Sequence, residues 1–327
     1  MKIRKYQKGD EKEILSLDRR LETHPWNRRD LSNWYWKYTD QNPSGASFVW
    51  VAAEDCKILA HFAAVPYKIK VFDRELRASH SIGALVEEKY QNKGLLKFVG
   101  DKLFEDLSEN GIPFTYGFPN DRSYGLHKSH MGYSDLIQFD NWVIQKSGIN
   151  KVHSEHVGST VFKKIDNFDD AFDELWRSCS CGYEIAIVRD KEYLKWRYLS
   201  RPDVKYYPYG FYRDNNLKGF IVLKLYQEDK VLRGNVLDIF ARRDDGDTLS
   251  ELINGGLNFF KEKSVDEATC WIWGNVLIED ILCNSGFERA RANVPLVIRV
   301  NKDFENAEGI KNNEHWFFAM GDSTEIF

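Results

Sequence analysis

The sequence lacks a hydrophobic run long enough to cross a membrane, because no stretch approaches the ~18 to 20 uninterrupted apolar residues that a span needs. Residues 1–5 read as the start of an ordinary strand, and no apolar core of a signal peptide follows them. The sequence also lacks an excess of positive charge. Its formal net charge is −4, whereas a dedicated nucleic-acid-binding protein normally has a clear basic excess. These absences predict a cytoplasmic protein without a membrane or nucleic-acid partner.

Cysteine is scarce and poorly spaced for a structural role. The five cysteines are an odd number in a long chain, which does not suit a disulfide framework. Cys179 and Cys181 are separated by one residue, whereas zinc-binding pairs usually have two residues between them, and no second pair lies at a complementary distance. The sequence therefore predicts free thiols and no metal site.

Apolar and aromatic residues are abundant instead. The chain has 327 residues, more than one ordinary core usually serves, and 43% of them are hydrophobic, so we expect two packed domains. Aromatic residues make up 14% of the chain. Most of them fit bulky cores, but some could line a groove for a ring-shaped ligand, because flat aromatic faces stack on bases and sugars. Composition leaves both interpretations open.

The order of predicted elements repeats along the chain. Periodicity, caps and turn residues predict a strand, two helices, a meander of three strands, a helix, a strand, a helix and a strand in the first half. Their ranges are 2–6, 10–22, 30–41, 48–54, 58–70, 77–86, 94–110, 114–118, 123–130 and 138–145. A similar order follows at 169–176, 190–199, 206–213, 218–226, 235–241, 248–263, 267–273, 276–284, 296–300 and 316–320.

This repeat indicates a duplicated domain. Its period of about 160 residues is far longer than the repeats of solenoids. The polar segment 147–159, which contains two glycines, is the natural boundary. We therefore predict an α/β fold with two tandem domains, 1–150 and 151–327, each a mixed, mostly antiparallel sheet flanked by helices.

The segment from Val86 to Leu96 has the features of a phosphate-binding turn. It follows a strand and opens a helix, and a helix N-terminus presents unpaired N–H groups and about half a positive charge. Gly94 lets a pyrophosphate approach the backbone closely, and Lys93 and Lys97 add positive charge nearby. The place of this turn after the third strand of the meander makes the signal more specific than its letters alone. The alternative is a capped helix without a ligand.

These residues resemble the GCN5-related N-acetyltransferase (GNAT) superfamily, whose pyrophosphate loop reads Gln or Arg, two residues, Gly, one residue, then Gly or Ala. Residues 91–94 and the strand 82–86 match this pattern, whereas Leu96 replaces the second small residue. Residues 120–133, which end in Met-Gly-Tyr, resemble the closing helix and turn of the family. The resemblance implies acyl-coenzyme A as co-substrate, bound by Leu85, Val86, Gln91, Asn92, Lys93, Gly94, Leu95, Leu96 and Asn120.

The corresponding turn of the second half, residues 242–248, carries three aspartates. They would repel a ligand with several negative charges by several kcal/mol at low effective dielectric. We therefore expect this half not to hold coenzyme A. The alternative is that the aspartates point to solvent and the loop still binds.

A narrower resemblance concerns the second half. Residues 193–199 and the C-terminal residues 316–323 resemble a tandem-GNAT group in bacterial surface-polysaccharide synthesis. That group includes N-acyltransferases of dTDP-linked amino-deoxy sugars, some of which transfer 3-hydroxybutyryl groups. This resemblance implies a nucleotide-linked amino sugar as acceptor. Arg197 could then bind a nucleotide phosphate, or it could only fasten a helix to its sheet.

Acyl transfer needs an oxyanion site and proton transfer. Backbone N–H groups at residues 83–86 could stabilise the oxyanion where, in the family, this strand parts from its neighbour. The family places a Tyr proton donor on the helix after the fifth strand, where Tyr124 and His127 are the candidates. His80, or Glu87, could act as a base. The alternative is that no dedicated base is used, because a sugar amine is partly neutral near pH 7. For each side chain an ordinary packing or surface role is the alternative.

The acceptor is expected between the two domains. In the family the first two helices border the acceptor site, which makes His24, Trp26 and Arg28 candidates. Trp34 and Tyr38 have the i, i+4 spacing of a core stripe, so Trp36 faces elsewhere and is the better ligand candidate. A GNAT N-acetyltransferase for another small amine or peptide, or a non-catalytic acyl-CoA-binding module, remain the alternatives, and the protein could be a monomer or a homodimer.

Overall fold

The computed structural model describes residues 1–21, 30–39, 41–152 and 160–323. The first half contains β1 (Lys2–Lys5), α1 (Asp10–Arg20), α2 (Leu31–Tyr38), β2 (Phe48–Glu54), β3 (Lys57–Val71), β4 (Arg74–Val86), α3 (Leu95–Glu109), β5 (Phe114–Gly117), α4 (Asp121–His130) and β6 (Ser134–Gln145). The second half contains α5 (Lys146–Ile149), β7 (Thr160–Lys164), α6 (Asp170–Cys179), β8 (Ile185–Ile187), α7 (Lys191–Tyr198), β9 (Tyr206–Arg213), β10 (Asn216–Glu228), β11 (Val231–Ala241), α8 (Gly246–Glu262), β12 (Glu267–Cys270), β13 (Ile272–Trp273), α9 (Val276–Asn284), β14 (Glu288–Val300) and β15 (Trp316–Ala319).

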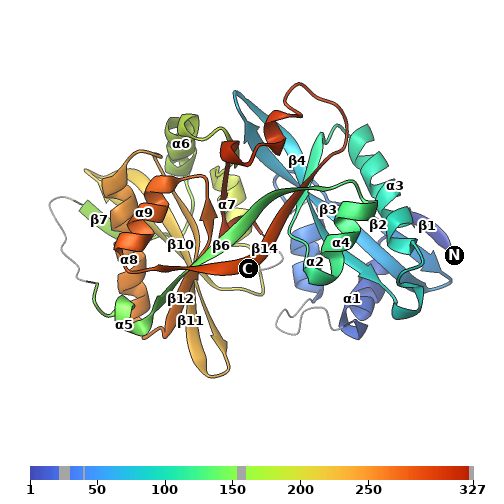
Figure 1. Ribbon diagram of the computed structural model, residues 1–327, viewed down its shortest axis with the longest axis horizontal. Coiled ribbons are helices and arrows are strands. Elements are labelled where there is room, and N and C mark those ends of the chain that lie inside the picture. The colour runs from blue at the N-terminus through green and yellow to red at the C-terminus, as the bar shows by residue number, and fades with distance from the viewer. Residues whose placement is uncertain (22–29, 40, 153–159, 324–327) are drawn as a thin grey trace.

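The predicted α/β fold and the repeat of its elements are confirmed. The series from β7 to β14 follows the order of the series from β1 to β6, with the short strands β8 and β13 as additions (Figure 1). Several ends agree with the local signals: Asp30, Asn120 and Asp190 cap α2, α4 and α7 by accepting from a backbone N–H, and Gly111 follows α3 with a φ of +77°. Within the described residues, no helix has the length and apolar character needed to span a bilayer.

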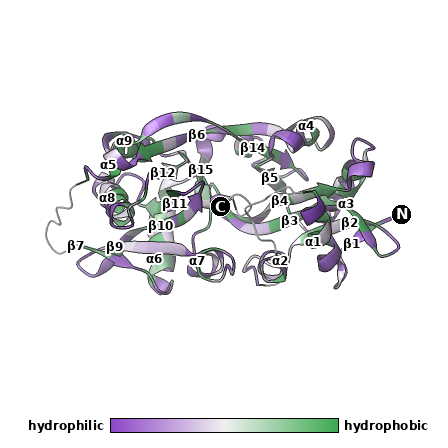
Figure 2. Ribbon diagram, turned by 90° about the horizontal axis from the view of Figure 1, so that it is seen from below, coloured by the Kyte–Doolittle hydropathy of each residue, from purple (hydrophilic) through white to green (hydrophobic). Residues whose placement is uncertain are grey.

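The two halves share one sheet because they exchange a strand. β14 from the second half pairs antiparallel with β5 and with β6, and β6 from the first half pairs with β14 and β12. The described residues thus form one sheet of 15 strands, in which β6 and β14 cross the middle of the molecule (Figures 1 and 2). Each half therefore completes its sheet with a strand of the other half.

The helices cover the sheet on both faces. In the first half α3 packs on β2 and β3 through an apolar face that includes Leu95, Val99 and Leu103, while α1 packs on β3 from the opposite face. In Figure 2, β6 and β14 run along the top of the view, with α9 near one end and α4 near the other, and α2 and α7 lie at the bottom. The core on the α2 and α7 side is continuous between the halves.

A pair of tryptophans at equivalent positions joins α2 to α7. The rings of Trp36 and Trp196 are stacked with centroids 4.9 Å apart. Nε1 of Trp36 donates to the carbonyl of Trp196 at 2.9 Å, and Nε1 of Trp196 donates to the carbonyl of Trp36 at 3.1 Å. Both buried indole N–H groups are satisfied across the interface, so this contact holds the halves in one relative position.

Candidate active site

The candidate site begins where β4 and β5 separate. These parallel strands pair only from Ser79 to Ser81, opposite residues 115–117, and β4 then continues to Val86 paired only with β3. At the last pair, Ser81 and Gly117, the two strands are still in close contact, because a Cβ added to Gly117 would lie 2.6 Å from the Ser81 Oγ. Beyond this point the two strands leave an opening between them.

A β-bulge lies at Gly83, just inside the opening. The register of β3 and β4 shifts between His61 and Ala63, and Gly83 has a φ of +64°, which favours glycine. Nδ1 of the buried His61 lies 2.6 Å from the Gly83 carbonyl oxygen, and the Tyr38 hydroxyl lies beside the same residue. The bulge interrupts the hydrogen-bond ladder, so that backbone groups beside it can form hydrogen bonds with a ligand. The structure thus has the interruption that the sequence predicts around residue 83.

The N-terminus of α3 lies at the outer end of the same opening. Its cap, Gly94, has a φ of +76°, and the first helical bond runs from the Phe98 N–H to the Gly94 carbonyl. The preceding amides, 95–97, have no acceptor within the helix and are directed out of its end. The side chain of Leu96 is only 9% exposed and packs in the core, so its size does not obstruct the turn.

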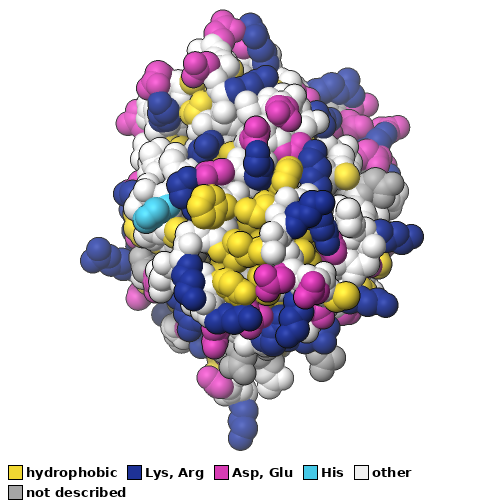
Figure 3. Space-filling model, turned by 90° about the vertical axis from the view of Figure 1, so that its right-hand side faces the viewer, with side chains coloured by type: hydrophobic (Ala, Val, Ile, Leu, Met, Phe, Trp, Pro, Cys, Tyr) yellow, Lys and Arg dark blue, Asp and Glu magenta, His cyan; other side chains and the backbone are white. Residues whose placement is uncertain are grey.

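A cavity of about 540 Å³ connects the bulge with this helix end. Eight of the nine residues predicted to bind the cofactor line it: Leu85, Val86, Gln91, Asn92, Gly94, Leu95, Leu96 and Asn120. The ninth, Lys93, is exposed beside them, with Nζ 5.9 Å from the Tyr90 ring. Lys97 and Arg122 also line the cavity and add positive charge, which Glu88 partly offsets. Figure 3, which looks at the end of the molecule formed by the first half, shows a hydrophobic patch bordered by Lys and Arg side chains, with Asp and Glu side chains among them.

The structure distinguishes the two candidates for proton transfer on α4. His127 lines the cavity and is 4% exposed, and its Nδ1 donates to the Ser123 carbonyl at 2.8 Å, which leaves Nε2 as the proton-accepting nitrogen. Burial lowers the pKa of His127, so the ring is neutral at pH 7. Tyr124 instead donates its hydroxyl to Asp135 at 2.6 Å, and this bond raises the pKa of Tyr124. Of the two, His127 has the better position.

We expect His127→Ala to lower kcat by about 100-fold, because it removes a group that can move a proton inside the cavity. Tyr124→Phe is the matched control, since the Tyr124 hydroxyl is bound to Asp135 outside the cavity lining. Its kcat should stay within about threefold of the wild type. Steady-state rates with saturating acyl-CoA measure both variants. A larger loss from Tyr124→Phe than from His127→Ala would reverse the assignment.

His80, the predicted base, lies behind the cavity wall. It is 1% exposed, and its ring stacks on Tyr116 with centroids 4.8 Å apart. It is not among the described residues that line the cavity. Glu87 forms an ion pair with Arg20 at 3.0 Å. These contacts favour the alternative of a packing role for His80 and a surface role for Glu87.

The predicted acceptor residues have different outcomes. His24, Trp26 and Arg28 lie outside the described residues. Trp36 has one ring face against Trp196 and the other under the Arg201 guanidinium, 5.1 Å away, so the structure assigns it to the interface between α2 and α7. Trp34 and Tyr38 form the expected stripe, with ring centroids 4.2 Å apart.

Arg197 is fully buried. Its Nε donates to the Gly321 carbonyl at 3.0 Å and its Nη1 to the Tyr206 hydroxyl at 2.6 Å. These bonds fasten α7 to the C-terminal segment and to β9. They favour the structural alternative over a contact with a nucleotide phosphate.

The equivalent opening of the second half is filled. β11 and β12 pair from Arg233 to Val236, and a register shift at Leu237 preserves the bulge. Here the C-terminal segment enters: Met320 N–H donates to the Trp271 carbonyl, and a Cβ on Gly321 would lie 3.0 Å from the Leu237 carbonyl oxygen. β15 and the residues after it therefore occupy the space that is a cavity in the first half.

The turn before α8 is also occupied by the chain itself. The Asp245 carboxylate caps α8 by accepting from the Thr248 N–H at 3.0 Å and from its hydroxyl at 2.7 Å. Asp244 pairs with Arg242. An anionic side chain thus takes the helix end that a phosphate would need. This arrangement supports the expectation that the second half does not hold coenzyme A.

A buried ion cluster anchors the segment that fills the second opening. Arg189 is fully buried, with Nε 3.1 Å from Asp238 and Nη2 2.9 Å from Asp322. The Tyr198 hydroxyl donates to Asp238 at 2.9 Å, and Asp322 accepts the Ala319 N–H at 2.8 Å. Two carboxylates here share one guanidinium. Burial first, with the Asp238 charge adding to it, raises the pKa of Asp322 to about 6 against the lowering effect of Arg189.

This raised pKa predicts a pH dependence of stability. Asp322 binds a proton more tightly in the folded state than in the unfolded chain. The stability that this protonation contributes is therefore full below about pH 4 and is lost as the pH rises through 6. Lowering the pH from 7 to 5 should therefore stabilise the wild type by roughly 1 to 2 kcal/mol relative to Asp322→Asn. Urea denaturation at both pH values measures this difference. Parallel pH profiles of the two proteins would contradict it.

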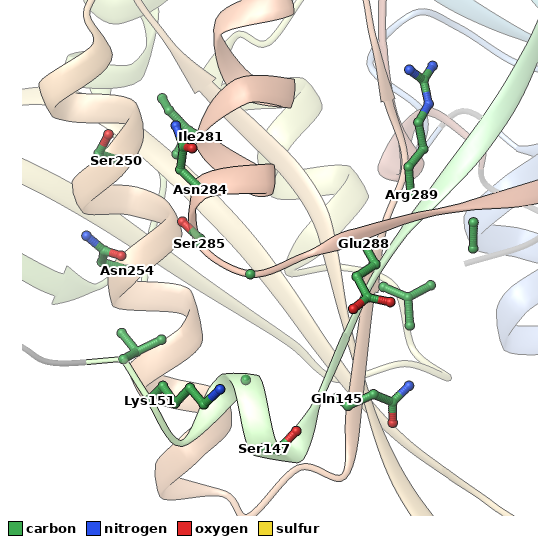
Figure 4. Close-up of a pocket in the computed structure, with 15 residues that line it drawn as sticks. Gln145, Ser147, Lys151, Ser250, Asn254, Ile281, Asn284, Ser285, Glu288 and Arg289 are labelled. Atoms are coloured by element: carbon green, nitrogen blue, oxygen red, sulfur yellow. The ribbon is translucent and has the colours of Figure 1, made fainter.

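A larger cavity of about 940 Å³ lies in the second half, between α5, α8, α9 and the start of β14 (Figure 4). Its lining mixes small polar residues, such as Ser250 and Asn254, with the charged residues Lys151, Glu288 and Arg289. Among the described residues that line it, the helix N-terminus is that of the four-residue α5, and there is no counterpart of the bulge at Gly83. We therefore assign the candidate active site to the smaller cavity, where both features meet.

Several residues of the site have no signal in the sequence. His61 lies on β3 under the bulge, while Phe118, which directly follows β5, and Val294 on β14 line the cavity. Arg122 also lines the cavity and adds positive charge to it. Only the register of the strands and the exchange of β14 bring these side chains to the site.

Comparison with known proteins agrees with this geometry. Residues 2–134 match the family model described as an acetyltransferase (GNAT) domain. No curated protein matches the sequence. Among solved structures, a GCN5-related N-acetyltransferase from Anabaena variabilis is similar with a TM-score of 0.67 and 14% identity, over 92% of this chain and 73% of its own.

Two further structures are similar over most of the chain. A GCN5-related N-acetyltransferase from Kribbella flavida has a TM-score of 0.64 and 12% identity, over 91% of this chain and 70% of its own. The N-myristoyltransferase of Saccharomyces cerevisiae, solved with bound myristoyl-CoA, has a TM-score of 0.61 and 12% identity, over 93% of this chain and 79% of its own. Residues 2–134 thus match the GNAT acetyltransferase domain in sequence, and more than nine tenths of the chain shares its fold with these three transferases.

Proposed function

We propose that the protein is an acyl-CoA-dependent N-acyltransferase with one cofactor site, in the first half. The observation that carries this proposal is the cavity that joins the bulge at Gly83 to the helix end at Gly94. A pyrophosphate fits the helix end, and a thioester carbonyl fits the interrupted strand. The match of residues 2–134 to the GNAT domain supports the same reaction.

In this proposal an amine attacks the thioester carbonyl beside Gly83. The C–N bond forms, the carbonyl oxygen gains negative charge, and backbone N–H groups next to the bulge stabilise it. His127, which is neutral at pH 7, takes a proton from the attacking nitrogen through Nε2. The C–S bond then breaks, and the departing thiolate receives that proton. The products are an amide and coenzyme A.

The division into a cofactor domain, 1–150, and an acceptor domain, 151–327, is part of the proposal. The filled opening between β11 and β12 and the Asp245 cap support a single cofactor site. The second half still contributes to the site, because Val294 on β14 lines the cavity.

For the acceptor we propose the amino group of a dTDP-linked amino-deoxy sugar, with 3-hydroxybutyryl as one acyl group to be tested. This finer proposal rests on the resemblance of residues 193–199 and 316–323. Tyr193, Trp196, Arg197 and Asp322, which belong to those segments, are buried, so they act on the acceptor only through the elements they hold in place.

Release of free thiol from acyl-CoA tests both levels of the proposal. Purified protein is mixed with acetyl-CoA or 3-hydroxybutyryl-CoA and a panel of dTDP-amino sugars, other small amines and peptides. Thiol release with dTDP-amino sugars supports the finer proposal. Release only with another amine would reject the sugar and keep the acyltransferase. Binding of acyl-CoA without release on any acceptor would favour a binding module.

A further inference from the structure

Two of the residues that line the cavity come from different halves of the chain. The pairing of β4 and β5 ends at Ser81 and Gly117, so Phe118 is the first residue beyond the last pair. Phe118 and Val294, the latter on the exchanged strand β14, both line the cavity. We propose that these two side chains form the end wall of the acyl site and restrict the enzyme to short acyl groups, an inference that rests on the proposed function.

The direction of the bound chain follows from the two ends of the cavity. The helix end at Gly94 takes the phosphates, and the bulge at Gly83 takes the thioester, so the acyl group continues along β4 toward Ser81. A strand rises about 3.3 Å per residue, which places Ser81 about 7 Å beyond the bulge. An extended carbon chain advances about 1.3 Å per bond, so an acyl chain of about four to five carbons, including its terminal methyl group, fills this length.

The end wall is held rigidly from behind. The Phe118 ring lies in a cluster of aromatic rings at centroid distances of 5.5 to 6.2 Å: His80, Trp271, Tyr116, Phe139 and Phe318. Val294 is the register partner of Phe139 on the neighbouring strand β6. Packed side chains of this kind give way little, so a longer acyl chain cannot push the wall aside. Chain length is thus limited by residues from both halves.

Dissociation constants for acetyl-, butanoyl-, hexanoyl- and octanoyl-CoA, measured by calorimetry, test this inference without an acceptor. For the wild type we expect butanoyl-CoA to bind at least tenfold more tightly than octanoyl-CoA. Val294→Ala and Phe118→Leu should move the preferred chain toward hexanoyl or longer by enlarging the site, and Val294→Phe should move it toward acetyl. Phe98→Ala is the control, because Phe98 is 56% exposed on α3 and is not among the residues that line the cavity.

The outcomes separate this inference from the proposed function. If the wild type binds no acyl-CoA, both fail. If it binds the series and the enlarged and narrowed variants keep the wild-type chain preference, the end wall is wrong and the acyltransferase stands. A shift in the Phe98→Ala control as large as that of the Val294 variants would also overturn the inference. The two Val294 variants alter a partly exposed position and change chain preference in opposite directions, so a general loss of folding cannot imitate the expected result.

Discussion

Gly94→Trp should lower the affinity for acyl-CoA at least 100-fold, a loss of about 3 kcal/mol or more. Two effects act together at this position. Gly94 has a φ of +76°, where an L-residue costs about 1 to 2 kcal/mol, so the turn would change its conformation. The indole would also stand at the exposed helix end where the pyrophosphate approaches. Calorimetric titration with acetyl-CoA measures the loss.

Gly246→Trp is the matched control in the second half. Gly246 is the first residue of α8, as Leu95 is the first residue of α3. Asp245 caps α8 where Gly94 caps α3. A Cβ there would meet Leu277 at 3.6 Å, an ordinary contact, and the adjacent helix end is already capped by Asp245. We expect its affinity to stay within about threefold of the wild type. Equal losses from both substitutions would overturn the assignment of one cofactor site.

Arg189→Met should reduce the free energy of unfolding by about 3 to 5 kcal/mol. The substitution replaces the arginine by an unbranched apolar side chain and removes the positive charge between Asp238 and Asp322, both of which are fully buried. Two carboxylates would then remain in the core without a cation. Urea denaturation at pH 7 measures the effect, and a loss below about 1 kcal/mol would show that the cluster contributes little.

A triple variant separates the lost charge from lost packing. Combining Arg189→Met with Asp238→Asn and Asp322→Asn removes all three charges at nearly constant volume. We expect it to recover about half or more of the lost stability, because uncompensated buried charge is the main cost. If the triple variant is no more stable than Arg189→Met alone, the hydrogen bonds and packing of the guanidinium matter more than its charge.

Local signals predicted the elements near the site well. The glycine at position 94, the polar turn before it and the apolar stripe of α3 all act within a few residues, so they can be seen in sequence. Seven of the eight predicted cofactor residues that line the cavity belong to this local segment, residues 85–96, and the eighth is Asn120. The caps at Asp30, Asn120 and Asp190 are of the same local kind.

Long-range pairing was predicted less well. The sequence indicated strands at 138–145 and 296–300, but β6 begins at Ser134 and β14 at Glu288, because each extends across the other half of the sheet. The charged residues Glu288, Arg289 and Arg291 hide this strand, since they lie on an exposed stretch that pairs with β6. An exchange of strands cannot be read from periodicity, which reports only the faces of one element.

The side chains around the chemistry show the same contrast. Helical spacing correctly separated Trp36 from the stripe of Trp34 and Tyr38, but it could not show that Trp36 faces Trp196 rather than a ligand. His61 reaches Gly83 through the register of β3 and β4. Phe118 and Val294 meet at the cavity although they are far apart in the chain.

The phosphate turn at residues 91–96 and the repeated order of elements follow from the sequence alone, because caps, glycines and apolar spacing act locally. The sequence also predicted, from three aspartates, that the second turn would not hold a cofactor. Only the tertiary structure revealed a second feature that favours this prediction: the C-terminal segment fills the second opening and is anchored by Arg189, over 100 residues earlier in the chain. Contacts across such a separation depend on which strands pair and in which register, and these are properties of the folded sheet as a whole.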